Sequence, residues 1–325
     1  MPRPEDVFRR SDDPRLGEVI EFWRGDAAAL VAGRPVLVGF PQDEGVRRNH
    51  GRVGAAAGPR DIRHALWRLT PYDGAHDVDL AALAPLDAGN VRIQGSLEET
   101  QTALGEVVGG ILEAGAIPVV LGGGHETAYG HFLGYLVAAR PVGIINIDAH
   151  LDVRPFPEGH GHSGSPFRQA LEHPGQPLPG ERYVCLGAEP SAVSRAHVTY
   201  LRERGGVVRW AAEVRSDLSR HFRAECERLA GAGCQVYVTI DADVVAAAEV
   251  PGVSAPNALG LSGVAVAECA YLAGLSPAVS SLDVVEVNPR HDQDGRSVRW
   301  AALVVWQFLA GLAARRAGDR GGSKT

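Results

Sequence analysis

The feature that most constrains this chain is an apolar run that ends in metal-type side chains. The run begins at Val142 and is typical of a buried strand in a parallel sheet. Asp148, His150 and Asp152 follow it at alternate positions. Side chains two apart on an extended segment point the same way, so these three groups converge on one point. Charge repulsion makes this convergence unfavourable unless a cation lies among the three side chains. The alternative is a solvated loop that carries them by chance.

The rest of the chain alternates predicted strands with predicted helices. Further strands are predicted at 34–40, 116–121, 182–187, 207–210, 235–243 and 278–287, and helices at 59–69, 97–114, 127–139, 166–172, 191–204, 218–230, 262–273 and 298–313. This alternation predicts a single three-layer α/β/α domain over residues 1–325, with a mostly parallel, doubly wound sheet. We expect residues 1–33 to be peripheral and residues 318–325 to form a disordered tail.

Composition argues against several classes of protein. The net charge of −7 leaves no basic footprint for nucleic acid. The N-terminus is charged, and the longest uncharged stretch, 250–267, contains prolines and glycines, so neither a signal peptide nor a membrane helix is expected. The four cysteines form no CxxC pair and suggest free thiols in a reducing compartment. We therefore expect a cytoplasmic protein that acts on a small molecule.

Other metal-type side chains follow other predicted strands. His125 comes after strand 116–121 and a triple glycine, Asp241 and Asp243 end strand 235–243, and Glu286 lies near the end of strand 278–287. Ligands bind at the carboxyl ends of the strands in open parallel sheets. The shared location of these groups predicts a site at that edge.

The donor set predicts which metal the site holds. The donors are His125, Asp148, His150, Asp152, Asp241 and Asp243. Many carboxylates, some imidazole and no thiolate suit Mn²⁺, Fe²⁺ or Co²⁺ better than structural Zn²⁺. Four carboxylates suit two ions, which can lower the pKa of a shared water to about 7 and so provide hydroxide at neutral pH. The chemistry expected is hydrolysis at an electrophilic carbon.

Five sequence blocks occur in the order found in a known family. LGGGHE, NIDAHLDVR, TIDADVV, PGVSAPNALGLS and SLDVVEVNP resemble the signature blocks of the ureohydrolase (arginase) family. The resemblance implies an arginase-like fold, two Mn²⁺ ions per chain and a homo-oligomer, either a trimer or a hexamer. It implies the following ligands: His125, Asp148, Asp152 and Asp241 for one ion, and Asp148, His150, Asp241 and Asp243 for the other.

The resemblance also implies catalytic roles. Glu286 matches the acidic residue that holds the amidine or guanidine group, Asp283 lies behind the ligands, and Asp243 can move a proton to the leaving amine. Arginases and agmatinases have histidine where this chain aligns Ser163. An alignment shifted by one residue places His162 there instead, so the proton shuttle is left open.

Further stretches are similar to the formimidoylglutamase subgroup. They include GFPQDEGVRRNHGRVGA, GGGHETAYGHF and HSGSPFRQAL. The resemblance implies attack of a metal-bridged hydroxide on the amidine carbon of N-formimino-L-glutamate, giving L-glutamate and formamide, a step of histidine degradation. Three alternatives are a guanidino hydrolase that releases urea, a non-catalytic binding protein, and a single-metal amide deacylase.

The long polar stretch after the first predicted strand carries three candidate substrate-binding residues. Arg47, Arg48 and Arg52 lie at the edge of the sheet where the metal ligands are expected. An arginine side chain can bind a carboxylate through two hydrogen bonds. We expect at least one of the three to bind a substrate carboxylate, the alternative being that they are solvated or contact another subunit.

Overall fold

A nine-stranded sheet forms the centre of the molecule. The structure is a computed structural model, and it describes residues 12–322 of the 325-residue chain. Every neighbouring pair of strands in this sheet is parallel. The order is β1-β5-β2-β6-β11-β10-β7-β8-β9. The bounds are β1 Glu21–Phe22, β2 Pro35–Gly39, β5 Leu86–Asn90, β6 Ile117–Leu121, β7 Val142–Ile147, β8 Tyr183–Ala188, β9 Val207–Trp210, β10 Gln235–Asp241 and β11 Val279–Val285.

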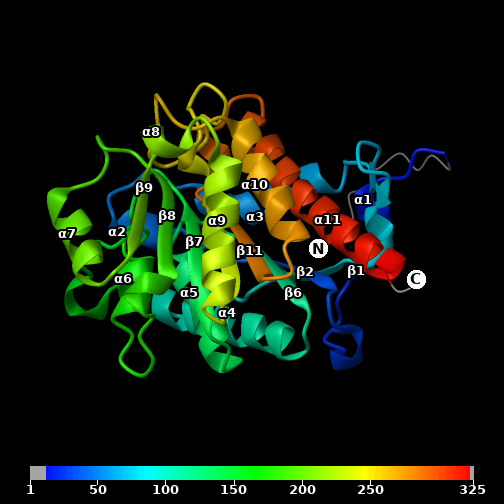
Figure 1. The fold of residues 1–325 in the computed structure, drawn as a ribbon, viewed down its shortest axis with the longest axis horizontal. Coiled ribbons are helices and arrows are strands. Elements are labelled where there is room, and N and C mark those ends of the chain that lie inside the picture. Colours follow the sequence, from blue (N-terminus) through cyan, green and yellow to red (C-terminus); the bar gives the residue numbers. More distant parts are fainter. Residues whose placement is uncertain (1–11, 323–325) are drawn as a thin grey trace.

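Helices cover both faces of this sheet, as Figure 1 shows for α9, α10 and α11 on one side. That layer contains α3 Gly58–Leu66, α8 Ala211–Val214, α9 Leu218–Gly231, α10 Gly263–Leu275 and α11 Arg296–Gly322. The other layer contains α4 Leu97–Glu113, α5 Thr127–Val137, α6 Pro166–Leu171 and α7 Arg195–Glu203. The predicted three-layer α/β/α fold with a parallel sheet is therefore confirmed.

Several central strands contribute side chains to both hydrophobic cores. In β7, Ile145 and Ile147 pack against the layer that contains α11, whereas Val142 and Ile144 pack against the layer that contains α5. This follows from the alternation of side chains along a strand. It also explains why the strand is apolar along its whole length, since both of its faces are buried.

The strand β5 was not expected from the sequence. Its segment, LDAGN, is short and contains a charged residue. The structure buries Asp87 of this strand against Arg63 of α3, with Nε 2.9 Å from Oδ2 and both side chains only 1% exposed. A strand stabilised by a buried ion pair from a distant helix lacks the apolar pattern by which strands are identified.

The polar stretch from 41 to 58 is more ordered than a long loop. It contains α2, Glu44–Arg48. Asp43 accepts hydrogen bonds from the N–H groups of Gly54 (2.6 Å) and Ala56 (3.3 Å), and Glu126 accepts one from Gly45 (2.7 Å). The stretch is thereby tied to itself and to the segment after β6.

The chain ends differ partly from the expectation. Residues 1–11 lie outside the described part, while α1, Leu16–Val19, and β1 place the following residues at the edge of the sheet. Helix α11 includes residues 318–322, where a disordered tail was expected, and residues 323–325 lie outside the described part. The segment Arg296–Gly318 of α11 is long and apolar enough to cross a membrane, but 67% of its most apolar window is buried inside the protein.

Candidate metal centre

The candidate site is built on four neighbouring strands in the middle of the sheet. These strands are β6, β11, β10 and β7, in that order. His125 follows β6, Glu286 follows β11, Asp241 ends β10 and Asp148 follows β7. All four strands are parallel, so their carboxyl ends bring these side chains to one edge, as the sequence predicted.

The first cluster surrounds the imidazole of His125. Its Nδ1 atom lies 3.3 Å from a carboxylate oxygen of Asp148, 3.0 Å from one of Asp152 and 3.0 Å from one of Asp241. The side chains of His125 and Asp148 are fully buried, or nearly so. These four residues are the set expected around one metal ion.

The second cluster contains Asp148, His150 and Asp243. The Nδ1 atom of His150 lies 3.5 Å from Asp148 and 3.3 Å from Asp243. In each cluster, one ligand atom per residue lies within 4.8 Å of all the others, and Asp148 belongs to both. Asp241 belongs only to the first cluster, and its Oδ1 accepts the N–H of Asp243 at 2.8 Å. Its role as a second bridging ligand stays a prediction.

Hydrogen bonds from the surroundings orient these ligands. Nε2 of His125 lies 3.1 Å from the hydroxyl of Thr239 on β10, and the N–H of His125 donates to Glu286 at 2.8 Å. Asn146 on β7 donates to Asp148 at 3.0 Å. Partners of this kind fix the ring orientation and the tautomer of a metal-binding histidine.

The backbone at the site is unusual at three points. Asp152 and Glu286 have positive φ angles of 46° and 61°, which are uncommon for residues other than glycine. Gly123, in the triple glycine, has no room for a side chain, because an added Cβ would lie 1.8 Å from the carbonyl oxygen of Gln42. The carbonyl of Gly123 accepts the N–H of Glu286 at 2.8 Å, so the triple glycine holds this acid in place.

The electrostatics of the cluster favour cations. Burial raises the pKa of Asp243 to about 6, and burial together with the neighbouring Asp243 raises the pKa of Asp241 well above its usual value. Burial and the Asp241 carboxylate likewise raise the pKa of Glu286. The negative charge of Asp243 raises the pKa of His150. These carboxylates therefore hold protons more tightly than usual until positive charge is supplied.

Several buried polar atoms of the cluster lack a hydrogen-bond partner. They are Oδ1 of Asp243, Oε2 of Glu286 and Nδ1 of His125, which lies 3.0 Å from two carboxylate oxygens but makes no hydrogen bond with them. Buried polar atoms are rarely left without a partner, and a bound cation or a substrate group would supply partners for these atoms. The oxygen-rich donor set with two imidazoles fits a pair of Mn²⁺ ions.

A cavity of about 270 Å³ opens onto the cluster. Its floor contains His150, Asp152, Asp241, Asp243 and Glu286. Its walls contain Asn49, His50, Gly51, Arg52, Arg154, Ser163, Ser254 and Ala255. The metal-type residues and the candidate substrate-binding residues therefore share one space.

Only one of the three arginines predicted to bind substrate lines this cavity. Arg52 lies on the wall, where its guanidinium donates to the carbonyl oxygens of Val253 and Ser254. Arg47 is 66% exposed and pairs with Glu44. Arg48 pairs with Glu98 and also donates to the carbonyl oxygen of Gly161 at 2.9 Å. The structure does not bring Arg47 or Arg48 to the cavity, because both are held by nearby acids.

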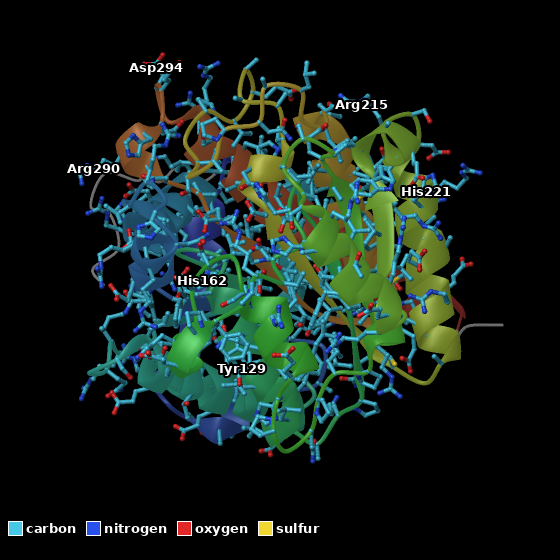
Figure 2. The ribbon with its side chains drawn as sticks, turned by 90° about the vertical axis from the view of Figure 1, so that its left-hand side faces the viewer. Tyr129, His162, Arg215, His221, Arg290 and Asp294 are labelled. Atoms are coloured by element: carbon cyan, nitrogen blue, oxygen red, sulfur yellow. The ribbon has the colours of Figure 1, made fainter. Side chains whose placement is uncertain are left out.

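Ser163 and His162, in the loop after β7, have different surroundings. Ser163 lines the cavity, and its hydroxyl accepts a hydrogen bond from the side chain of Asn49 at 3.1 Å. His162, labelled in Figure 2, has Nε2 3.0 Å from the carbonyl oxygen of Pro155 and accepts the N–H of Gly164 on Nδ1. Both nitrogens of His162 are thus occupied within the loop, so the structure places Ser163, and not His162, beside the cluster.

Sequence reasoning missed Arg154 and Asn49. Arg154 continues the alternation of Asp148, His150 and Asp152, a signal that could have placed it on the same side. It donates to the side chain of Asn49 at 3.2 Å, and both residues line the cavity. No periodic pattern marks Asn49, which directly follows α2 and lines the cavity.

We expect the metal-free protein to lose stability as the pH rises from about 5 to about 8. The pKa of Asp243 is raised to about 6 in the folded state. Between the ordinary carboxyl pKa and this value, the folded state binds more protons than the unfolded state, so stability falls with rising pH. The raised pKa of His150 acts in the same direction above about pH 6.5.

Thermal melting of the metal-free and Mn²⁺-loaded protein across this interval tests the expectation. The stabilisation by Mn²⁺ should grow with pH, because the ion binds the deprotonated ligands. Asp243→Asn should flatten the slope of the metal-free protein. A metal-free protein whose Tm rises steadily across the interval would contradict this account.

The sequence matches one family model and is similar to curated proteins over most of its length. The model of the Arginase family matches residues 34–311. A formimidoylglutamase from Chromobacterium violaceum is 38% identical over 303 residues, covering 91% of this chain and 94% of that protein. A formimidoylglutamase from Klebsiella pneumoniae is 41% identical over 298 residues, covering 90% and 91%.

Solved structures of proteins named formiminoglutamase or formimidoylglutamase are also similar to this chain. The crystal structure of Trypanosoma cruzi formiminoglutamase with Mn2+2 is similar, with a TM-score of 0.84 and 35% identity, covering 94% of this chain and 100% of that one. Formimidoylglutamase from Bacillus subtilis has a TM-score of 0.88 at 22% identity, covering 96% of each chain, and this likeness shows the fold alone.

Proposed function

This chain belongs to the arginase family, and we propose that it is a binuclear manganese hydrolase that cleaves N-formimino-L-glutamate into L-glutamate and formamide. The observation that carries the proposal is the pair of His/Asp clusters joined by Asp148 at the floor of a cavity with arginines on its wall. The floor suits an amidinium beside a metal pair, and the wall suits carboxylates.

The roles of the residues follow from their positions. When bound, a pair of Mn²⁺ ions supplies a hydroxide nucleophile at neutral pH. We propose that His125, Asp148, Asp152 and Asp241 hold one ion and that Asp148, His150, Asp241 and Asp243 hold the other. Glu286 has a buried carboxylate oxygen without a partner and lines the cavity, so it can pair with the amidinium of the substrate.

The reaction requires a proton at the leaving nitrogen. The bond between the amidine carbon and the glutamate nitrogen breaks, and this nitrogen leaves as an amine only after protonation. Asp243 has a partner-free Oδ1 and lines the cavity, whereas both nitrogens of His162 are occupied. We therefore assign the proton transfer to Asp243, with Ser163 close to the reacting groups.

Arg154 and Arg52 are the residues assigned to the substrate carboxylates. Arg154→Ala should raise KM by about ten- to a hundredfold with little change in kcat, since a charge-assisted hydrogen bond contributes about 1.5–3 kcal/mol. Arg52→Ala should have a smaller effect, because backbone carbonyls already occupy part of its guanidinium. Arg47→Ala, on the exposed side of α2, is the matched control and should leave KM unchanged. An unchanged KM in both cavity variants would remove the arginines from substrate binding.

The alternative, a guanidino hydrolase that releases urea, is less well supported. The relatives are named formimidoylglutamase, and two arginines on the wall would repel a second cationic group, such as the amine of agmatine. A substrate panel with the Mn²⁺-loaded protein tests the proposal. We expect formamide and L-glutamate in equal amounts from N-formimino-L-glutamate. Release of ammonia instead, or faster release of urea from arginine or agmatine, would overturn it.

The wider setting is also proposed. The four cysteines are buried and free, which agrees with a reducing compartment, and we propose a cytoplasmic enzyme of histidine degradation. We propose that it assembles as a trimer or a hexamer and binds neither nucleic acid nor membrane. Light scattering of the purified protein tests the assembly.

A further inference from the structure

Two arginines face one cavity at the end of the sheet that lies away from the metal centre. The cavity has a volume of about 220 Å³ and lies where β7 and β8 begin. Arg140 lies just before β7, and Arg182 lies just before β8. The two strands are neighbours, with Ile144 opposite Tyr183. Both guanidinium-bearing residues therefore reach the cavity from adjacent strands, while β7 carries the metal ligands at its far end.

These two arginines differ in their hydrogen bonding from the other arginines that are buried or half-buried. Within residues 12–318, every other arginine that is buried or half-buried donates to a carboxylate or a carbonyl oxygen. They are Arg15, Arg34, Arg48, Arg63, Arg168 and Arg315. The side chains of Arg140 and Arg182 are half-buried, yet they make no hydrogen bond or ion pair in the described part of the chain.

The cavity wall offers no compensating negative charge. Besides the two arginines, it is lined by apolar side chains, among them Phe132, Leu136 and Leu178, and by the exposed Gln176 at its edge. Two partly desolvated cations without an anion are unfavourable, and an anion between them would relieve the cost. The planar guanidinium matches the geometry of carboxylate, sulfate and phosphate groups.

We propose that this cavity binds a small molecule through an oxyanion group held between Arg140 and Arg182. The apolar wall contacts the body of an organic anion, and the two guanidinium groups hold its carboxylate or phosphate. The site is separate from the metal centre and does not depend on the reaction proposed above.

Isothermal titration of the Mn²⁺-loaded full chain tests the proposal with sodium sulfate and sodium benzoate, at an ionic strength held constant with chloride. We expect one binding event per chain. Arg140→Ala and Arg182→Ala should each weaken it by about tenfold or more, as expected for a charge-assisted hydrogen bond, and the double variant should abolish it. Tighter binding of benzoate than of sulfate would identify an organic anion, and the reverse an inorganic one.

Three further variants make the result decisive. Gln176→Glu leaves both arginines in place but adds negative charge at the cavity edge, so it should weaken binding even if the double variant fails to fold. A variant lacking the exposed Arg195 and Arg202 of α7 is the matched control and should bind as the parent does. A variant lacking Arg52 and Arg154 should also retain binding. Absence of binding beyond chloride, unchanged affinity in the Arg140, Arg182 and Gln176 variants, or loss of binding in the Arg52/Arg154 variant would overturn the proposal.

Discussion

Replacing Asp148 by asparagine should remove manganese from the protein and lower kcat/KM by about two to four orders of magnitude. Asp148 is the residue shared by the two clusters, and its side chain is fully buried. Loss of one partner of a buried charge interaction costs roughly 3–5 kcal/mol, and each 1.36 kcal/mol is tenfold in rate. The asparagine keeps the size of the side chain, so the effect reports on charge.

Metal analysis and steady-state kinetics on the same preparation check this result. The control is Asp73→Asn, which changes a buried aspartate that caps the turn before His76, far along the chain from the ligands. It should retain two manganese ions and full activity. An Asp148→Asn protein with normal metal content and turnover would show that the clusters are not the metal centre.

Replacing Glu286 by glutamine should leave both manganese ions bound but lower kcat/KM by about two to three orders of magnitude. Glu286 belongs to neither ligand cluster. Its Oε1 accepts the N–H of His125, which a glutamine oxygen can also do, while its Oε2 lacks a partner. Only the charge that would pair with the amidinium is lost, and truncating such a buried pair costs about 2–5 kcal/mol.

Thermal melting of the same variant without metal tests the charge repulsion at Glu286. The pKa of Glu286 is raised by burial and by the neighbouring Asp241 and Glu126. Glutamine removes one of these repelling charges, so the metal-free variant should melt at a higher temperature than the metal-free parent above neutral pH. Loss of manganese from Glu286→Gln, or normal turnover, would contradict the role assigned to this residue.

The positions of the proposed metal ligands were predictable because these residues lie at or just after the ends of apolar runs. Asp148, His150 and Asp152 alternate after one apolar run, and Asp241 and Asp243 end another. Parallel strands place their carboxyl ends together whatever their order in the sheet. The order itself, with β11 and β10 between β6 and β7, does not follow from these patterns.

The wall of the cavity was harder to predict, because it depends on contacts between distant segments. Arg48 and Arg52 lie in the same polar stretch, but Glu98 on α4 holds the first, whereas the carbonyls of Val253 and Ser254 hold the second beside the cavity. No pattern in the stretch distinguishes the two. Arg154 follows Asp152 at the next alternate position, so the same alternation could have identified it.

The strand β5 was missed for a similar reason. Its burial depends on the ion pair between Asp87 and Arg63, whose residues are far apart in sequence. A charged residue in a short segment usually indicates an exposed position. Only the tertiary structure shows that a partner is present.

Anomalous diffraction from manganese-soaked crystals, collected at the manganese absorption edge, is the most direct test. Two peaks should appear per chain, roughly 3.5–4 Å apart. One should lie beside His125 and Asp152, and the other beside His150 and Asp243, with Asp148 between them. A single peak, or manganese bound away from these residues, would contradict the assignment of a paired-ion centre to this edge of the sheet.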